Sequence, residues 1–133
     1  MLFRSSEVIE SDENEVVVDL DVTSYYPNLA IVNGFHPAHL GREFVSIYKH
    51  LFEQRKQYPK KSAESAMLKL ALNGVYGDSN NQFSVFYDPL YTMTITLNGQ
   101  LLLCMLAEGL MMIPGLQLIQ VNTDGLKIGR AHV

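Results

Sequence analysis

The sequence predicts an α+β domain, in which helices cover an antiparallel β-sheet and a hairpin of two helices is inserted into the chain. Three observations predict this class. Apolar and polar residues alternate in residues 15–21, and an apolar segment at 116–121 ends in a turn. Between these two segments, residues 42–57 and 62–76 carry apolar side chains at helical spacing. We therefore expect strands at 15–21 and 116–121, with helices between them.

The first strand is predicted over residues 15–21, because its apolar side chains alternate with polar ones and Asp21 falls at its end. The chain that follows is predicted to be irregular. Pro27, the pair Asn33-Gly34 and Pro37 are all residues that favour turns over regular structure.

Two helices are predicted next. In residues 42–57, helical spacing places five apolar side chains on one face: Phe44, Ile47, Tyr48, Leu51 and Phe52. Pro59 disfavours helix at the residue before it, so residues 58–62 form a connector. Residues 62–76 form the second helix, with Ser62 as its N-cap. The short connector predicts an antiparallel hairpin.

The remaining elements are predicted from residue 83 onward. Residues 83–87 and 91–96 are rich in β-forming side chains, which predicts two short β-segments around the turn at Asp88-Pro89. Asn98 is expected to cap a long helix that stops at Pro114-Gly115. Residues 116–121 then form a strand, and residues 122–125 form a tight turn.

Composition narrows the class of protein. The chain has 133 residues, of which 47% are hydrophobic and 18% charged, so it belongs with globular rather than disordered proteins. No apolar run approaches the ~20 residues of a membrane span, and acidic residues follow too soon after Met1 for a signal peptide. A single cysteine, Cys104, excludes a disulfide framework and fits a reducing compartment. Its apolar surroundings predict that it is buried.

The net charge of −4 is unusual for a protein that binds nucleic acid, but the charges are segregated along the chain. Residues 7–21 contain seven acids and no lysine or arginine. Residues 42–69 contain seven cations and three acids. A basic helical region that faces an acidic strand end would hold a polyphosphate next to metal ions. The alternative is two solvated surfaces of opposite charge.

Two aspartates carry the main chemical signal. Asp21 ends one predicted strand, and Asp124 lies in the turn after another. Magnesium takes oxygen ligands and needs only one or two carboxylates besides substrate phosphates. Between the aspartates, Lys69, Asn73 and Tyr76 share one helical face. A pair of carboxylates and a cation on a helix suit magnesium-dependent phosphoryl transfer, in which two ions act together.

Three phrases carry a resemblance to a known family. Residues 21–28 read Asp-Val-Thr-Ser-Tyr-Tyr-Pro-Asn, similar to the pattern Asp-x-x-Ser-Leu-Tyr-Pro-Ser. Residues 69–77 match Lys-x-x-x-Asn-Ser-x-Tyr-Gly, with Gly74 in place of serine. Residues 120–125 align with Tyr-x-Asp-Thr-Asp-Ser, with Asn122 at the first aspartate and Gly125 at the serine. Together they resemble the family B (alpha-type) DNA polymerases, in a phage or mobile-element branch, over residues 1–126.

The resemblance implies a role for each matching residue. Asp21 and Asp124 are the expected catalytic residues and bind two Mg²⁺ ions, which Mn²⁺ can replace, and Val22 is a further metal ligand. Tyr26 is expected to lie under the sugar and to reject a 2′-hydroxyl group. The other implied nucleotide-binding residues are Ser24, Tyr25, Arg55, Lys69 and Asn73. The implied DNA-binding residues are Tyr76, Gly77, Asn122 and Thr123.

The resemblance also implies a domain plan and partners. Residues 1–40 and 78–126 would form a polymerase palm, and residues 41–77 a fingers hairpin. The expected partners are primer–template DNA and deoxynucleoside triphosphates, with no membrane, in the cytoplasm of a bacterial host. The exonuclease and thumb domains of a parent protein are not represented.

Residues 127–133 read as the translation of a sequencing-library adapter. On this interpretation the fold is truncated, and the sheet ends after Asp124 with an unpaired edge. Because family members make most of their DNA contacts through the thumb, we expect the 133-residue chain alone to show little or no polymerase activity.

Two alternative functions are open. The first is another palm enzyme, a reverse transcriptase or an RNA-dependent polymerase. Such enzymes place two adjacent aspartates in the second turn, whereas residues 122–124 read Asn-Thr-Asp. The second is a catalytically inactive, nucleic-acid-binding remnant. A protein selected to be inactive would not be expected to keep four such residues together: Asp21, Arg55, Lys69 and Asp124.

Overall fold

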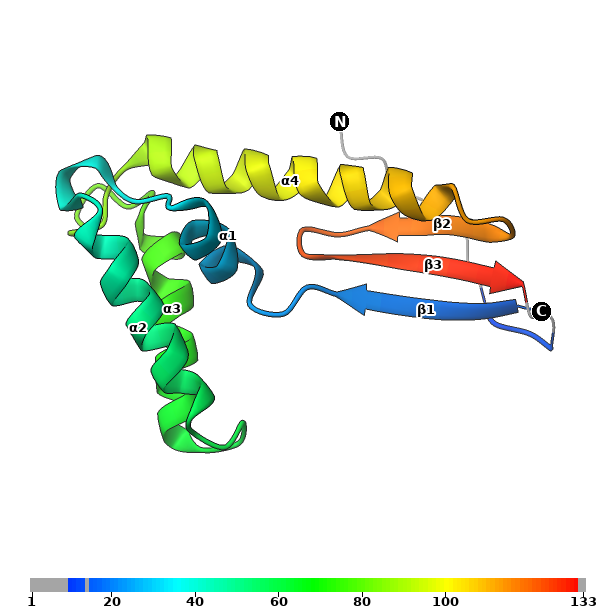
Figure 1. Ribbon diagram of the computed structural model, residues 1–133, viewed down its shortest axis with the longest axis horizontal. Helices are drawn as coiled ribbons and strands as arrows, with labels where there is room; N and C mark the ends of the chain where they lie inside the picture. Colours follow the sequence, from blue (N-terminus) through cyan, green and yellow to red (C-terminus); the bar gives the residue numbers. More distant parts are fainter. Residues whose placement is uncertain (1–9, 14, 132–133) are drawn as a thin grey trace. The chain divides into compact units, whose positions relative to one another are not determined.

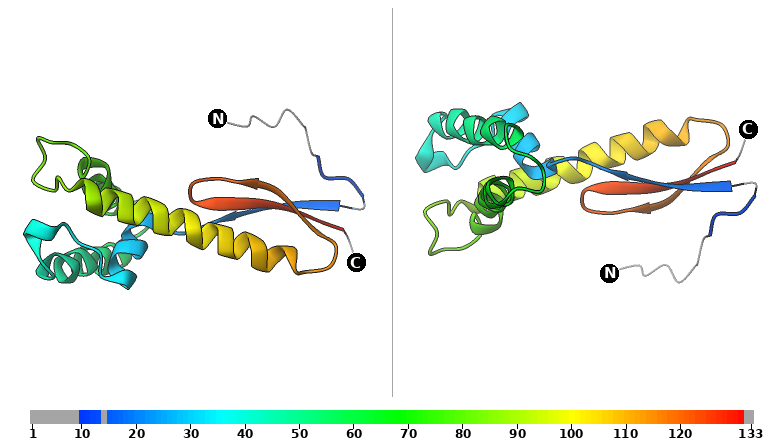
Figure 2. Two further views of the ribbon diagram at one scale, coloured as in Figure 1. Left: turned by 90° about the horizontal axis from the view of Figure 1, so that it is seen from above. Right: turned by 90° about the horizontal axis from the view of Figure 1, so that it is seen from below.

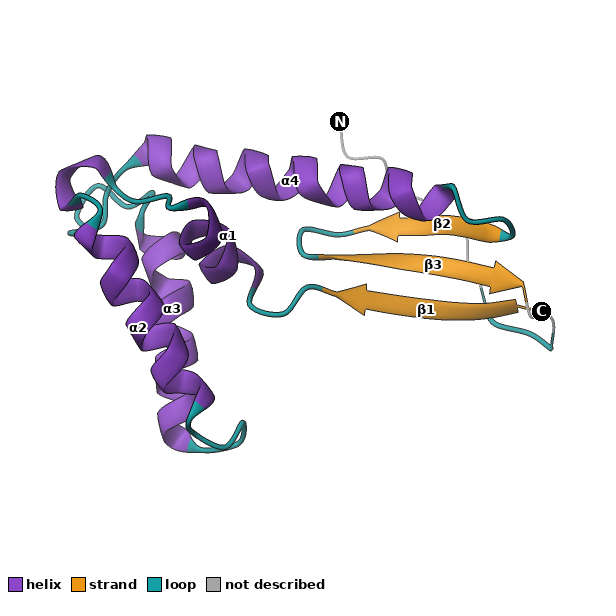
Figure 3. Ribbon diagram, viewed as in Figure 1, coloured by secondary structure: helices purple, strands orange, loops and turns teal. Residues whose placement is uncertain are grey.

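The computed structural model describes residues 10–13 and 15–131 and has an α+β fold, which confirms the predicted class (Figures 1 and 3). In order, its elements are β1 (Glu15–Asp21), α1 (Tyr25–Asn33), the 3₁₀ helix η1 (Ala38–Leu40), α2 (Glu43–Lys56), α3 (Ala63–Asp78), α4 (Pro89–Met111), β2 (Leu116–Val121) and β3 (Gly125–Ala131). The chain divides into two compact units. We call residues 1–22 and 101–133 the sheet unit, and residues 23–100 the helical unit.

The sheet unit is built on three antiparallel strands in the order β1-β3-β2. Figure 2 shows this sheet nearly edge-on, with a visible twist. The strands predicted at 15–21 and 116–121 are confirmed with these bounds. The turn predicted at 122–125 is also present, because Val121 pairs with Leu126 and the Asn122 N–H donates to the Gly125 carbonyl oxygen at 2.8 Å.

The prediction that the sheet ends after Asp124 with an unpaired edge there is wrong. β3 continues through Ala131 and is the central strand, paired with β1 on one side and β2 on the other. Residues 127–131 therefore belong to the fold described here, and residues 132–133 lie outside the described part. The adapter origin of this segment stays a prediction, since pairing in a sheet does not reveal how the codons arose.

The apolar core of the sheet unit is small. Among its described residues, the buried apolar side chains are Leu103 and Ala107 of α4 and Leu126 and Ile128 of β3. Cys104 is exposed, so the prediction that it is buried is wrong. Several large apolar side chains on this part of α4 are also exposed: Leu101, Leu102, Met105, Leu106 and Met111.

Helix α4 differs from the expectation that no apolar run approaches the length of a membrane span. Its 23 residues are long and apolar enough to cross a membrane, with a mean hydropathy of 1.4 over 18 residues, of which 28% are buried. By length and composition alone, this is weak evidence for a membrane location, because an apolar helix of a water-soluble protein meets the same criteria.

The helical unit packs α1, α2, α3 and the first half of α4 around one apolar core. The buried members of that core are Leu29, Ala30, Phe44, Tyr48, Leu72, Val75, Tyr91 and Ile95. Helices α2 and α3 lie side by side as the predicted antiparallel hairpin (Figure 1). The predicted cap is also confirmed, since the Ser62 hydroxyl accepts a hydrogen bond from the Ser65 N–H at 3.1 Å.

Helix α1 corrects the prediction of irregular chain after residue 21. Tyr25–Asn33 is helical, with Pro27 in the first turn. A proline is tolerated there because the N–H it lacks has no partner inside the helix. Gly34 ends the helix in the left-handed conformation at φ 70°, and its N–H donates to the Ala30 carbonyl oxygen. The Asn33-Gly34 pair thus marks a helix end, a use of glycine that also fits the sequence.

Helix α4 corrects the prediction of β-segments at 83–87 and 91–96 and of a cap at Asn98. Residues 83–87 form turns, and the helix begins at Pro89, where proline is favoured. The Asp88 carboxylate accepts hydrogen bonds from the N–H groups of Ala38 at 2.8 Å and Tyr91 at 3.1 Å. These backbone donors, Ala38 foremost, hold the pKa of Asp88 below its usual range.

Threonines explain why a β-rich sequence forms the start of α4. The hydroxyls of Thr94 and Thr96 each donate to the carbonyl oxygen four residues earlier, at 2.7 and 2.8 Å. Such bonds satisfy the hydroxyls within the helix. The β-branched residues therefore fit the helix, although their intrinsic preference is for strands.

Candidate functional site

Asp21 and Asp124 are neighbours across the β1–β3 pair of the sheet unit. Asp21 pairs with Gly125, and the Val22 N–H donates to the Asp124 carbonyl oxygen at 2.8 Å. Asp21 is the last residue of β1, and Asp124 lies in the turn directly before β3. Both side chains are exposed. Two carboxylates from separate sequence phrases therefore stand at the same end of the sheet.

Gly125 allows the two strands to approach at this point. A Cβ atom on Gly125 would lie 2.5 Å from the Leu20 carbonyl oxygen, 3.3 Å from the Asp21 Cα and 3.4 Å from the Asp21 Oδ1. The first of these distances is too short for any side chain. The close approach of the strands thus explains why residue 125 is glycine, where the polymerase pattern has serine.

We predict that Gly125→Ala forces β3 away from β1 beside the two aspartates. Overpacking of this kind costs about 1–3 kcal/mol, so the midpoint of urea unfolding should fall. Gly109→Ala in α4 is the matched control in the same unit, because a Cβ there meets nothing within 4 Å. Alanine in a helix interior should stabilise by roughly 0.5–1 kcal/mol. If the midpoint of urea unfolding is the same for Gly125→Ala and the wild type, β1 and β3 do not pair in this register.

The donor set at this end of the sheet fits a hard divalent cation. Within residues 10–13 and 15–131, no group of three or more Asp, Glu, His or Cys side chains could hold a metal ion. The two carboxylates and the Val22 carbonyl are oxygen ligands, which Mg²⁺ and Mn²⁺ prefer. Magnesium commonly takes one or two carboxylates and completes its shell with water and substrate phosphates. Asn122 and Thr123 occupy the adjoining turn and are exposed.

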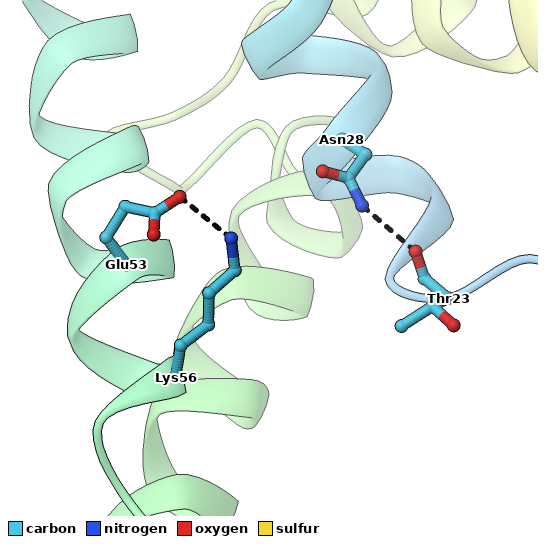
Figure 4. A network of polar contacts seen from close by, with 4 residues as sticks. All are labelled: Thr23, Asn28, Glu53 and Lys56. Carbon is cyan, nitrogen blue, oxygen red and sulfur yellow. Dashed lines mark hydrogen bonds and ion pairs between the residues drawn. The ribbon is translucent and has the colours of Figure 1, made fainter.

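Ser24, the N-cap residue of α1, has an uncommon backbone conformation. Its φ of 51° and ψ of 50° lie in the left-handed region, and it is the only non-glycine residue with positive φ in the described chain. Such a conformation costs energy and is most often found at functional sites. Its carbonyl oxygen accepts from the Asn28 N–H, and the Asn28 side-chain amide donates to the Thr23 carbonyl oxygen at 2.9 Å (Figure 4). Asn28 therefore holds this turn in place.

Arg55 of α2 is aimed at the same turn. Its Nη1 donates to the Ser24 hydroxyl at 3.3 Å, and its Nε is buried with no hydrogen-bond partner in the part of the chain that the structure describes. The neighbouring Lys56 differs, because it pairs with Glu53 at 2.9 Å (Figure 4) and lies 4.8 Å from the centre of the Phe52 ring. Arg55 therefore has an N–H donor without a partner among the described residues, whereas the Lys56 ammonium group is already paired with Glu53.

Tyrosines of α1 and α3 form a stacked pair. The rings of Tyr26 and Tyr76 lie 4.2 Å apart with their planes 10° from parallel. Tyr25 contacts α4 instead, where its hydroxyl donates to the Gly99 carbonyl oxygen. Burial, and then the neighbouring Tyr26, raise the pKa of Tyr25. A Cβ on Gly99 would lie 3.2 Å from the Leu29 side chain and 3.4 Å from the Tyr25 ring, so α4 crosses close to α1 here.

Of the three side chains predicted to share one face of α3, only Tyr76 takes part in these contacts. The side chains of Lys69 and Asn73 are exposed and make no hydrogen bond or ion pair with other described residues. A Cβ on Gly77 would meet nothing within 4 Å, so the fold itself does not require glycine there. The structure thus links Ser24 to Arg55 and Tyr26 to Tyr76, while Lys69 and Asn73 stand free on α3.

Three residues that contact this site have none of the site roles predicted from the sequence. Thr96 bonds the Tyr76 hydroxyl at 2.8 Å, and Ser79 bonds both the Tyr76 carbonyl oxygen and the Thr92 hydroxyl. Thr92 and Thr96 are four residues apart, which is a shared face on a helix but not a distinctive pattern in a strand. A β-segment at 91–96, as predicted, would not link these residues to α3.

No protein-family model matches the chain, and no curated protein matches its sequence at a significant level. The functional assignment therefore rests on the sequence phrases and on the local geometry of each unit.

Proposed function

We propose that this chain is the catalytic core of a template-dependent DNA polymerase of the family B type, which adds deoxynucleotides to a primer 3′-hydroxyl. The sheet belongs to a palm, and α2 and α3 form a fingers hairpin. One observation carries the proposal: Asp21 pairs with Gly125, so that Asp21 and Asp124 come from two separate motifs to one end of the sheet.

Two divalent ions in such a site activate the attacking hydroxyl and stabilise the leaving pyrophosphate. In this proposal the Asp21 and Asp124 carboxylates and the Val22 carbonyl hold them. Because both carboxylates are exposed, substrate phosphates and water can complete the coordination. Two like charges side by side also create the negative potential that attracts cations.

The helical unit supplies groups for the nucleotide. Arg55 presents a planar fork of donors, which matches pairs of phosphate oxygens. Its buried, unpartnered Nε supports this role, because a buried donor gains more from an anionic ligand than a hydrated one does. Lys69 contributes an exposed ammonium group, and Asn73 an amide on the same face of α3. Tyr26 offers the flat surface that would exclude a 2′-hydroxyl.

The remaining assignments concern the primer–template. Tyr76 and Gly77 lie near the end of α3, and Asn122 and Thr123 lie in the turn before Asp124. In this proposal they contact DNA. Asn122 stands where the family has an acid, which reduces negative charge beside the primer and leaves two carboxylates for the metal ions.

We expect the 133-residue chain to bind dTTP in a metal-dependent manner, which isothermal titration calorimetry can measure. Binding should require Mg²⁺, be lost in EDTA, and be weaker for dTMP, because the monophosphate lacks the β- and γ-phosphates. Lys69→Gln should weaken dTTP binding, whereas Lys49→Gln, at an exposed lysine of α2, should not. Equal affinity for dTMP and dTTP, or binding unaffected by EDTA, would overturn the proposal.

A further inference from the structure

We infer that Thr96 is a positioning residue: through Tyr76 it fixes the Tyr26 ring, and so sets discrimination between deoxyribonucleotides and ribonucleotides. This inference rests on the proposed function, which places Tyr26 at the sugar. It concerns residues of the helical unit alone. Thr96 itself touches neither the sugar nor the phosphates in this scheme.

The first step is the coupling of the two rings. Tyr26 and Tyr76 come from different helices, and their rings stack almost in parallel, 4.2 Å apart. Stacked rings at this separation cannot tilt independently without losing contact. A change in the orientation of Tyr76 is therefore expected to move the Tyr26 ring.

The second step is the direction of the Tyr76–Thr96 hydrogen bond. A threonine hydroxyl has one hydrogen, and the Thr96 hydroxyl donates it to the Thr92 carbonyl oxygen at 2.8 Å. At the Tyr76 hydroxyl, also 2.8 Å away, Thr96 must therefore accept, and Tyr76 donates. The far end of the Tyr76 ring is thus held to α4 by a bond with a defined direction.

The third step is a second attachment at the other end of the same residue. The Ser79 hydroxyl donates to the Tyr76 carbonyl oxygen at 2.6 Å and accepts from the Thr92 hydroxyl at 2.8 Å. Ser79 is fully buried, so these bonds have no competition from water. Tyr76 is therefore held at its main chain through Thr92 and at its phenol through Thr96, two residues one turn apart on α4.

A site that rejects one extra oxygen atom needs this rigidity. A binding group must be held within ~0.5 Å of its working position to be effective. A Tyr26 ring free to tilt with Tyr76 would open the space that a 2′-hydroxyl needs. Removal of the Thr96 hydroxyl should therefore relax the choice of sugar more than it weakens binding of the correct nucleotide.

Thr94 supplies a matched control. It is the same residue type on the same helix, and its hydroxyl donates to the carbonyl oxygen four residues earlier, as that of Thr96 does. Within the described residues, the Thr94 hydroxyl makes no hydrogen bond to another helix, whereas the Thr96 hydroxyl bonds Tyr76 of α3. Comparison of Thr96→Val with Thr94→Val therefore isolates the bond to Tyr76 from the cost of a lost hydroxyl in α4.

The test uses the 133-residue chain as wild type, Thr96→Val, Thr96→Ser and Thr94→Val. The first readout is NMR of ¹³C-labelled tyrosine rings. We expect Thr96→Val to shift the ring signals of both Tyr76 and Tyr26, and Thr96→Ser and Thr94→Val to leave them in place. The second readout is the ratio of affinities for Mg²⁺·dATP and Mg²⁺·ATP, which differ only in the 2′-hydroxyl. We expect Thr96→Val to lower this ratio about fivefold, equivalent to about 1 kcal/mol, and Thr96→Ser to restore it.

The outcomes separate the inference from the proposed function. Unchanged Tyr26 signals in Thr96→Val, or an unchanged dATP-to-ATP ratio while the wild type binds dATP, would overturn the inference and leave the polymerase proposal standing. A wild-type chain that binds neither nucleotide would overturn the polymerase proposal and the sugar role together. Thr96→Val should shift the Tyr76 and Tyr26 ring signals and lower the dATP-to-ATP affinity ratio. If Thr94→Val does neither, Thr96 is established as the positioning residue.

Discussion

Asparagine in place of Asp21 or Asp124 should lower the affinity of the chain for Mn²⁺ more than any other single change. Each substitution keeps the size of the side chain and removes one of the two carboxylates at this end of the sheet, beside the Asp21–Gly125 pair. Loss of an outer-shell partner alone typically costs 10–100-fold in metal affinity, and loss of a direct ligand should cost more. Titration of Mn²⁺ followed by electron paramagnetic resonance measures this affinity, with each variant compared with the wild type.

Asp19→Asn is the matched control for this experiment. Asp19 lies on β1 two residues before Asp21, and its exposed carboxylate stands 3.8 Å from the Lys127 ammonium. Because a surface pair of this kind contributes little, the variant should bind Mn²⁺ as the wild type does. A loss in Asp19→Asn as large as that in Asp21→Asn would show that Mn²⁺ responds to general negative charge and not to the aspartate pair.

Arg55→Met should give the second large effect, on binding of the nucleoside triphosphate. Hydrogen bonds to a charged group contribute about 1.5–3 kcal/mol, so the affinity for dTTP should fall roughly 10- to 100-fold. The free energy of unfolding should not fall with it. In the wild type the Arg55 Nε is buried without a partner, and its removal relieves that cost. Calorimetric titration and urea unfolding of one preparation measure the two quantities.

Lys56→Met, at the next residue, separates a specific contact from general positive charge. The Lys56 side chain is 58% exposed and already pairs with Glu53. Its loss should leave dTTP affinity unchanged and cost at most about 0.5 kcal/mol of stability. A marked loss of stability in Arg55→Met with normal dTTP affinity would mean that Arg55 supports the fold and does not bind phosphate.

The elements that the sequence predicted correctly are those with a clear hydrophobic period. Strand β1 alternates over residues 15–21, and α2 carries apolar side chains at helical spacing. The errors fall where local preference and context conflict. Pro27 and the threonines of residues 92–96 disfavour helices in general, yet a first-turn position and hydroxyl bonds within the helix accommodate them. Strand β3 is not predicted, because residues 127–133 read as the translation of an adapter.

Some features of the candidate site were predictable from the sequence and others were not. The aspartate pair was predictable, because both phrases place a carboxylate at the end of a strand and turn. The role of Gly125 was not, since the atom that excludes a side chain there, the Leu20 carbonyl oxygen, lies over 100 positions earlier in the sequence. The contact of Tyr76 with Thr96 depends on how α3 packs against α4. Contacts of this kind are set by strand register and helix packing, which a single sequence does not reveal.

We propose that Asp21 and Asp124 form one two-metal site. X-ray diffraction at the manganese absorption edge, from crystals of the chain with Mn²⁺ and dATP, tests it most directly. The account predicts two anomalous peaks about 3.5–4 Å apart, bound by carboxylate oxygens of Asp21 and Asp124 and by phosphate oxygens of the nucleotide. Carboxylates more than about 10 Å apart, too far for an ion pair at ~4 Å spacing to bridge, or manganese bound only elsewhere, would contradict it.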